Sequence, residues 1–254
     1  MPTFSHEGFD LAFIDEGEGD PVLLIHGFAS SVKVNWIGPG WVKTLTEAGY
    51  RVIAIDNRGH GNSSKSYDPE DYRPSRMAAD AAALLDHLGI ERAHLMGYSM
   101  GARVCAFTAL EHPAKVATIV FGGLGIGMVE GVGEWDAIAG ALLAEDPAAI
   151  DHPRGRMFRA FADQTKSDRR ALAACIATSR ELVSEADAAR ISQPTLIAVG
   201  TIDDIAGSPD RLAALMPQAE VFAIEGRDHM LSVGDRTFKK RVLGFLGQHP
   251  LRAR

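Results

Sequence analysis

Cysteine is scarce in this sequence, with only Cys105 and Cys175 among 254 residues. Both lie in apolar helical patterns, so we expect two buried free thiols rather than a disulfide. No Cys/His spacing typical of a metal site occurs, and the glycine-rich stretch FGGLGIGMVEGVG contains no G-x-G-x-x-G pattern. We therefore expect no metal and no dinucleotide or other cofactor.

Clusters of basic residues are also missing. The net charge of −7 is spread along the chain, which argues against a nucleic-acid partner or an anionic membrane surface. No apolar run approaches the roughly 18 residues of a transmembrane helix, and the first ten residues, MPTFSHEGFD, do not resemble a secretion signal. These absences favour a cytoplasmic protein that acts on a small organic molecule, and they leave the oligomeric state open.

Short runs rich in Val and Ile alternate with longer helical patterns, which is typical of a mostly parallel, doubly wound sheet. A hairpin of two further strands is expected before them, at Thr3–His6 and Leu11–Asp15. The six expected parallel strands are Val22–Ile25, Val52–Ile55, Ala93–Met96, Val116–Phe121, Thr195–Val199 and Val221–Ile224.

One long stretch, residues 123–191, contains no convincing strand and reads as a helical cap inserted after the sixth strand. The remaining parts, 1–122 and 192–254, are expected to form the core. Core helices are predicted at Trp41–Ala48, Pro74–Leu88, Met100–Glu111, Asp210–Met216 and Arg236–Leu246, and cap helices at Trp135–Ala144, Arg154–Ala162, Arg169–Arg180 and Ser184–Arg190.

Ser99 lies between two glycines in the stretch LMGYSMG, residues 95–101. In a chain with 26 glycines a G-x-S-x-G pattern is a weak signal by itself. Here, however, a strand is predicted before it and a helix after it, as a nucleophile elbow requires. Ser99 is therefore the candidate nucleophile.

A serine hydroxyl needs a base, and the base needs an orienting acid. The stretch TLIAVGTIDD places Asp203 and Asp204 just past one predicted strand, and VFAIEGRDHM places His229 past the next. We assign His229 as base and acid and prefer Asp203 as its orienting carboxylate, with Asp204 as the alternative.

Backbone donors for an oxyanion are expected from the N–H groups of Phe28, in LLIHGFASS, and Met100, after the nucleophile. His26 and His60 are interpreted as hydrogen-bonding residues of buried turns rather than as bases or ligands.

These motifs together resemble the alpha/beta-hydrolase family, and specifically its serine-type esterases and cofactor-free perhydrolase-like members. The resemblance covers residues 20–122 and 192–248. It implies an alpha/beta-hydrolase fold with an eight-stranded sheet and a triad of Ser99, Asp203 and His229. The matching stretches are HGF at 26–28, DNRGHGNS at 56–63, GYSMG at 97–101, GTID at 200–203 and RDHM at 227–230.

Serine at position 99 argues against epoxide hydrolases and haloalkane dehalogenases, which resemble this chain but carry a carboxylate there. The leading hypothesis is a carboxylesterase for small or medium acyl esters, acting through an acyl-enzyme. Two alternatives stay open: hydrolysis of a carbon–carbon bond in a keto acid, and a slow-turnover ligand receptor of the same fold.

The insertion offers candidates for the substrate pocket, although packing between helices explains most of its apolar residues equally well. Arg154, Arg156 and Arg159 are expected on a solvated face, with attraction of an anionic substrate as the alternative. The candidate pocket residues are Met128, Trp135, Met157 and Phe158.

Overall fold

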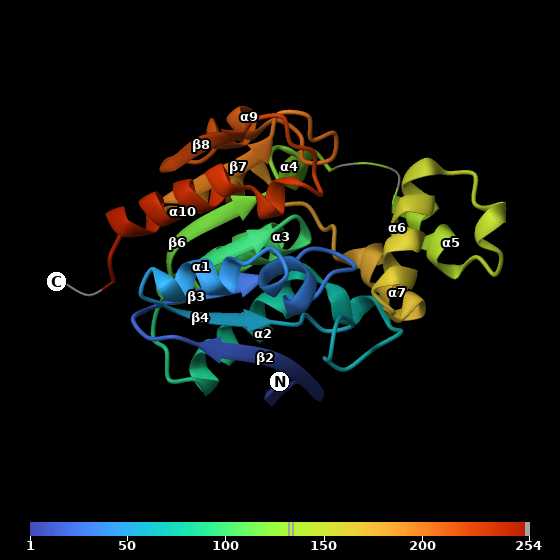
Figure 1. Cartoon of the computed structure of the whole chain (residues 1–254), viewed down its shortest axis with the longest axis horizontal. Coiled ribbons are helices and arrows are strands. Elements are labelled where there is room, and N and C mark those ends of the chain that lie inside the picture. Colours follow the sequence, from blue (N-terminus) through green and yellow to red (C-terminus); the bar gives the residue numbers. More distant parts are fainter. Residues whose placement is uncertain (132, 134, 252–254) are drawn as a thin grey trace.

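The computed structural model describes residues 1–131, 133 and 135–251, and within them the chain forms one eight-stranded sheet (Figure 1). The strand order is β1-β2-β4-β3-β5-β6-β7-β8. Strands β3 to β8 run parallel, and β2 is antiparallel to both β1 and β4. The predicted eight-stranded, mostly parallel sheet is thus confirmed. The strands are β1 Thr3–His6, β2 Phe9–Glu16, β3 Asp20–Ile25, β4 Tyr50–Ile55, β5 Ala93–Tyr98, β6 Val116–Gly122, β7 Thr195–Gly200 and β8 Ala219–Ile224.

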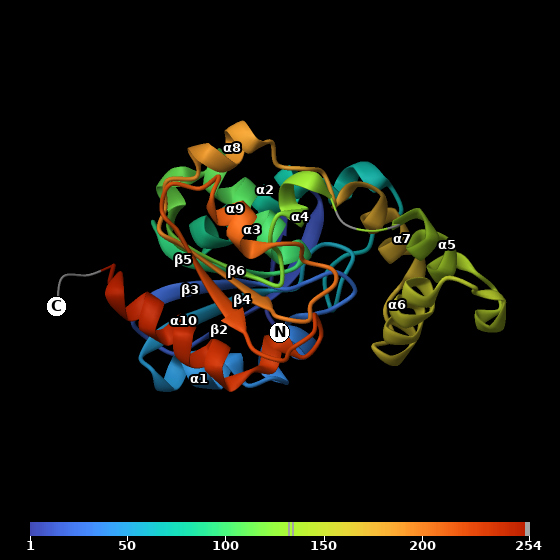
Figure 2. The ribbon, with the colours of Figure 1, turned by 90° about the horizontal axis from the view of Figure 1, so that it is seen from above.

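Helices cover both faces of this sheet (Figure 2). Helices α1 and α10 lie on one face, whereas α2, α3 and α9 lie on the other. Every residue of β5, β6 and β7 is buried as a result, as expected for central parallel strands. The helices are α1 Trp41–Glu47, α2 Pro74–His87, α3 Met100–Glu111, α4 Gly127–Glu130, α5 Trp135–Leu143, α6 Pro153–Gln164, α7 Arg169–Thr178, α8 Glu185–Arg190, α9 Pro209–Ala213 and α10 Arg236–Gln248.

Helices α5, α6 and α7 stand to one side of the sheet, beyond the carboxyl ends of its parallel strands (Figures 1 and 2). The short helices α4 and α8, which precede and follow these three helices in the chain, lie instead over the sheet near α3 and α9 (Figure 2). The division into a core of 1–122 and 192–254 and a cap of 123–191 stays a prediction. None of the described helices is both long and apolar enough to cross a membrane.

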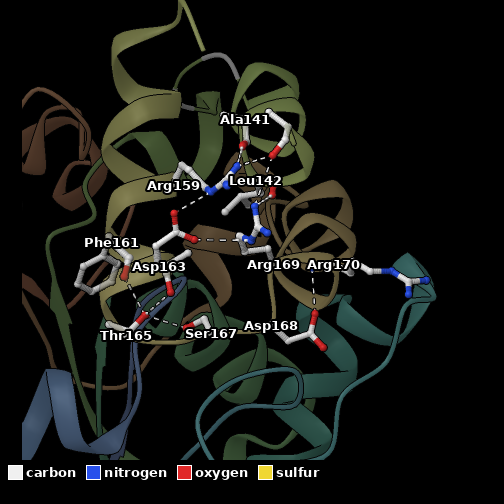
Figure 3. A network of polar contacts seen from close by, with 12 residues as sticks. Ala141, Leu142, Arg159, Phe161, Asp163, Thr165, Ser167, Asp168, Arg169 and Arg170 are labelled. Carbon is white, nitrogen blue, oxygen red and sulfur yellow. Dashed lines mark hydrogen bonds and ion pairs between the residues drawn. The ribbon is translucent and has the colours of Figure 1, made fainter. Parts of the chain in front are cut away.

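A polar network joins the three projecting helices (Figure 3). The buried Arg159 on α6 donates from Nη1 to the carbonyl oxygens of Ala141 and Ala144, at 3.2 and 2.6 Å, and from Nε to Asp163 at 2.9 Å. Arg169 on α7 reaches the same Asp163 carboxylate at 3.6 Å. The prediction of a solvated or substrate-facing Arg159 is wrong, because its donors satisfy carbonyls that the end of α5 leaves unpaired.

Candidate active site

The turn between β5 and α3 holds Ser99 in an unusual backbone conformation, with φ 53° and ψ −112°. Few residues other than glycine adopt a positive φ. The Ser99 N–H donates to the carbonyl oxygen of Gly122 at 2.8 Å, which ties the turn to the end of β6. The Ser99 side chain is half-buried.

The two glycines of the motif are required by close backbone contacts. A Cβ atom on Gly97 would lie 2.2 Å from the carbonyl oxygen of Gly101, and one on Gly101 would lie 2.0 Å from the carbonyl oxygen of Ile25. Any larger residue at either position would collide with the backbone. This is the strand–turn–helix arrangement that the motif predicts.

A carboxylate and an imidazole meet beyond the ends of the next two strands. His229, after β8, lies with Nδ1 2.8 Å from Oδ2 of Asp203, after β7. The other carboxylate oxygen of Asp203 accepts from the N–H groups of Ile205 and Ala206, at 2.8 and 2.9 Å. Burial by itself would raise the pKa of Asp203, but these hydrogen bonds hold the pKa below its usual value. An ionised carboxylate only accepts, so Nδ1 of His229 carries the proton and Nε2 is left as an acceptor.

The two neighbouring aspartates occupy very different environments. The Asp203 side chain is fully buried, whereas that of Asp204 is 80% exposed and pairs with Arg154 at 3.4 Å. The structure therefore brings Asp203, and not the alternative Asp204, to the imidazole.

Ser99 and His229 line one cavity of about 260 Å³. Among the described residues, no hydrogen bond joins the Ser99 hydroxyl to the His229 ring, and such bonds often tighten only when substrate binds. Tyr98 also lines the cavity, and its hydroxyl donates to the His229 carbonyl oxygen at 2.5 Å. Most of the other lining side chains are apolar, among them Val34, Trp135, Phe158, Phe161 and Ile205.

Near Ser99, the backbone N–H groups of Phe28 and Met100 have no acceptor among the described residues. Met100 is the first residue of α3, where helix N–H groups have no partner within the helix. In the loop that carries Phe28, by contrast, the flanking amides of Gly27 and Ala29 are both satisfied, by Asn35 and His60. The geometry thus leaves unpaired the two donors that the sequence suggests for an oxyanion.

A family model for the alpha/beta hydrolase fold matches residues 20–160, more than half of the chain. The chain belongs to the alpha/beta hydrolase fold family. The match confirms the fold class that the sequence motifs predict.

The curated relatives of this alpha/beta hydrolase have functions that differ from one another. The dihydrolipoyllysine-residue acetyltransferase component of an acetoin cleaving system from Pseudomonas putida is 29% identical over 253 residues, which cover 91% of this chain and 64% of that protein. Epoxide hydrolase B of Mycobacterium tuberculosis is 39% identical over 106 residues, covering 41% of this chain and 28% of that protein. The chain spans less than two thirds of the length of these relatives.

Solved structures match nearly the whole chain. A hydrolase from Pseudomonas aeruginosa PA01 shares 27% identity with a TM-score of 0.79, covering 96% of this chain and 97% of that one. An esterase from Exiguobacterium antarcticum, EaEST, shares 20% identity with a TM-score of 0.81, covering 97% and 100%. At 20% identity the second likeness shows the fold alone.

Two buried histidines support the Phe28 loop of this alpha/beta hydrolase. His26 donates from Nδ1 to the Gly27 carbonyl oxygen at 2.8 Å and accepts the Asn57 N–H at Nε2, at 3.0 Å. His60 accepts the Ala29 N–H at Nε2 and lies with Nδ1 3.0 Å from the Arg58 carbonyl oxygen. Burial lowers the pKa of both rings, for His60 to about 3. The interpretation of both as hydrogen-bonding turn residues is confirmed.

Two of the four candidate pocket residues line the cavity at Ser99: Trp135 and Phe158. Met128 is fully buried and is not among the lining residues. Met157 is 38% exposed and lines a separate surface hollow beside Arg154. The expectation for the two methionines is therefore corrected, because Met128 packs in the hydrophobic core and Met157 lines a different hollow.

Sequence reasoning overlooked Asn35 and Tyr98. Asn35 lies in a π-helical turn, Lys33–Ile37, and its Oδ1 accepts the Gly27 N–H at 2.9 Å while the side chain lines the cavity. No sequence pattern predicts the turn that holds Asn35. Tyr98, by contrast, directly precedes Ser99 in the serine motif, and this position indicates that it lies near the site.

Within the described part of the chain, no group of three or more His, Cys, Asp or Glu side chains is arranged to hold a metal ion.

Proposed function

We propose that this protein is a serine hydrolase that cleaves carboxylic esters of small or medium acyl size. Ser99 is the nucleophile, His229 the base and acid, and Asp203 the residue that orients His229. The N–H groups of Phe28 and Met100 bind the oxyanion. The observation that carries the proposal is the 2.8 Å contact between His229 and the buried Asp203, on the cavity that Ser99 also lines.

The reaction follows from the proton positions. His229 Nε2 removes the Ser99 proton as Oγ attacks the ester carbonyl carbon, and the oxyanion forms against Phe28 and Met100. The bond to the leaving alcohol breaks, and His229 returns the proton to that alcohol. Water then attacks the acyl-enzyme in the same way, releasing the carboxylic acid and restoring Ser99.

The chemical nature of the nucleophile, a hydroxyl group and not a carboxylate, distinguishes the proposed ester hydrolysis from epoxide hydrolysis. A carboxylate that opens an epoxide forms an ester, which water can cleave. A serine hydroxyl would form an ether, which water would leave intact, so Ser99 could not turn over. The serine is therefore suited to acyl transfer.

The cavity supports a modest substrate. Its volume of about 260 Å³ is slightly below the roughly 300–1,000 Å³ of typical ligand pockets. Phe158 and Trp135, whose ring centroids are 6.5 Å apart, form part of its apolar wall. A short or medium acyl ester fits such a site better than a long-chain lipid.

The test combines labelling with turnover. We expect a fluorophosphonate to label wild-type protein once per chain and a series of p-nitrophenyl esters to be hydrolysed, with both signals lost in Ser99→Ala. Asp203→Asn should lower kcat/KM by roughly 10³-fold or more, because the imidazole loses its orienting acceptor.

The exposed neighbour provides the matched control. Asp204→Asn removes the same charge one residue away and should leave ester hydrolysis within about threefold of wild type. Loss of activity in Asp204→Asn alone would refute the assignment of Asp203. Cleavage of a dienoate keto acid with no ester hydrolysis would favour the carbon–carbon hydrolase, and stoichiometric labelling without turnover would favour the receptor.

A further inference from the structure

A second, smaller chamber adjoins Ser99 on the side of α3 and α7. Its volume is about 30 Å³, room for a group of only a few atoms. It shares Phe28, Ser99, Trp135 and Ile205 with the larger cavity, so Ser99 lies at the boundary between the two. Its polar side chains besides Ser99 are Arg103, Ser179 and Arg180, and no described carboxylate lines it.

Arg103 presents a buried positive charge to this chamber. It lies one helical turn after Ser99 on α3 and is 4% exposed. Its guanidinium donates to the carbonyl oxygens of Gly127, Met128 and Glu181, at 3.0, 2.7 and 2.8 Å. These acceptors are uncharged and, within the described residues, nothing accepts from Nε, so the charge of Arg103 is held in place without a direct ion pair.

Arg180 adds a second positive charge that can change partners. Its Nη2 donates to Asp136 at 3.0 Å, and the Asp136 side chain is 97% exposed. Such surface pairs contribute little free energy. A bound anion could therefore replace Asp136 at low cost.

Two further acidic residues nearby, Glu181 and Glu130, pair with arginines that do not line the chamber. Glu181, next to Arg180 in sequence, pairs with Arg73 at 3.2 Å. Glu130 lines a wider hollow that shares Arg103 and Arg180 with the chamber, and its carboxylate pairs with Arg211. Arg103 and Arg180 thus line both the chamber and this hollow, and among the described residues no buried acid pairs with either guanidinium group.

We propose that this chamber binds a carboxylate on the acyl part of the substrate, so that the preferred esters are half-esters of short dicarboxylic acids. This inference rests on the proposed function, because it names the substrate class of the same Ser99 site. The half-ester carbonyl lies at Phe28 and Met100, its alcohol occupies the larger cavity, and its free carboxylate accepts hydrogen bonds from Arg180 and Arg103.

The experiment compares two esters of matched size in a pH-stat. Monoethyl glutarate carries the carboxylate, and ethyl 5-methylhexanoate carries an isopropyl group in its place. We expect wild type to prefer the half-ester in kcat/KM by about tenfold or more, and Arg180→Gln to lower that preference by about tenfold. Asp136→Asn, which frees Arg180, should raise the preference.

Arg156→Gln is the matched control. It removes the same charge from an exposed arginine of the same insertion, on α6, that lines neither chamber. The preference should stay at the wild-type value in this variant. Equal kcat/KM values for the two esters in wild type, or the same preference in Arg180→Gln as in wild type, would overturn the proposal.

A binding measurement separates the subsite from the chemistry. In a Ser99→Ala background, calorimetry should detect monoethyl glutarate, with about tenfold weaker binding when Arg180→Gln is added. If wild type hydrolyses neither ester and is not labelled at Ser99, the proposed function fails, but the difference in binding between the two Ser99→Ala proteins still tests the carboxylate subsite. Equal binding of monoethyl glutarate with and without Arg180→Gln would refute the subsite.

Discussion

At the residue scale, the site contains stored backbone strain. Of the four non-glycine residues with positive φ in the described chain, Ala29 and Ser99 belong to the two turns that form the site. A residue held in such a region costs on the order of 1–3 kcal/mol. The surrounding contacts of the elbow, which leave no room for a side chain at Gly97 or Gly101, maintain this conformation.

Replacing Ser99 should therefore affect stability in a way that depends on the substitute. Ser99→Gly is expected to be more stable than Ser99→Ala by about 1 kcal/mol, because glycine adopts positive φ without strain. Both variants should lack ester hydrolysis. Urea unfolding of the two proteins checks this, and equal midpoints and slopes would show that the turn is unstrained.

The residues of the proposed triad were predictable because each has a local sequence context. Ser99 stands in a strand–turn–helix motif, and Asp203 and His229 directly follow strands whose carboxyl ends share one edge. Arg103 and Arg180 have no such context. Their directions depend on how α3 and α7 pack against α4 and the chain around residue 181, and this long-range packing is not written in the local pattern.

At the element scale, the projecting helices depend on their polar network. Arg159, Asp163 and Arg169 join α5, α6 and α7 (Figure 3). These helices also carry Trp135 and Phe158, which line the cavity at Ser99. Loosening the network is therefore expected to disturb both stability and substrate binding.

Arg159→Leu tests this expectation. It leaves the carbonyl groups of Ala141 and Ala144 without their donor, which should lower the free energy of unfolding by about 2 kcal/mol and raise KM more than it lowers kcat. Urea titration and steady-state kinetics provide the two measurements.

Arg190→Leu serves as the control, because its exposed pair with Asp187 on α8 is worth little. Its unfolding free energy should stay within about 0.5 kcal/mol of wild type. If Arg159→Leu costs no more than Arg190→Leu, the network does not hold the helices.

Helix periodicity was sufficient to predict α5, α6 and α7 but not their roles. The pattern placed Arg159 among solvated residues because charged side chains on a helix usually face water. The burial of Arg159 is explained by the carbonyl groups at the end of α5, which accept hydrogen bonds from its guanidinium.

The predicted helix Asp210–Met216 ends earlier than expected, at Ala213. The N–H groups of Leu215 and Met216 donate to carbonyl oxygens three residues earlier, whereas an α-helix requires a separation of four residues.

At the scale of the whole molecule, several histidines are buried without charge. His94 on β5, 2.8 Å from the Thr118 hydroxyl, has its pKa lowered by burial to about 4, and the pKa of His60 is lowered to about 3. In the unfolded chain both would titrate near 6.5. Between these values the unfolded chain binds more protons than the folded protein, so stability falls as pH falls.

We expect the free energy of unfolding to drop by roughly 2–4 kcal/mol between pH 7 and pH 5, from His60 and His94 together. Above pH 7 this contribution is fully retained, and below about pH 3 to 4 no further loss comes from these two rings. Urea titrations across the range measure the dependence. His94→Gln should make it shallower by about half, and an unchanged pH dependence in that variant would exclude His94 as a source.

Strand β8 is one of the two edge strands of the sheet and is hydrogen-bonded only to β7. His229 lies five residues after Ile224, the last residue of this strand. A strand with a single neighbour detaches at lower free energy than the whole domain unfolds. Transient detachment of β8 would move the His229 imidazole away from Ser99 while the other seven strands stay paired. Mild heat or denaturant is therefore expected to abolish the proposed ester hydrolysis reversibly, well before the fold is lost.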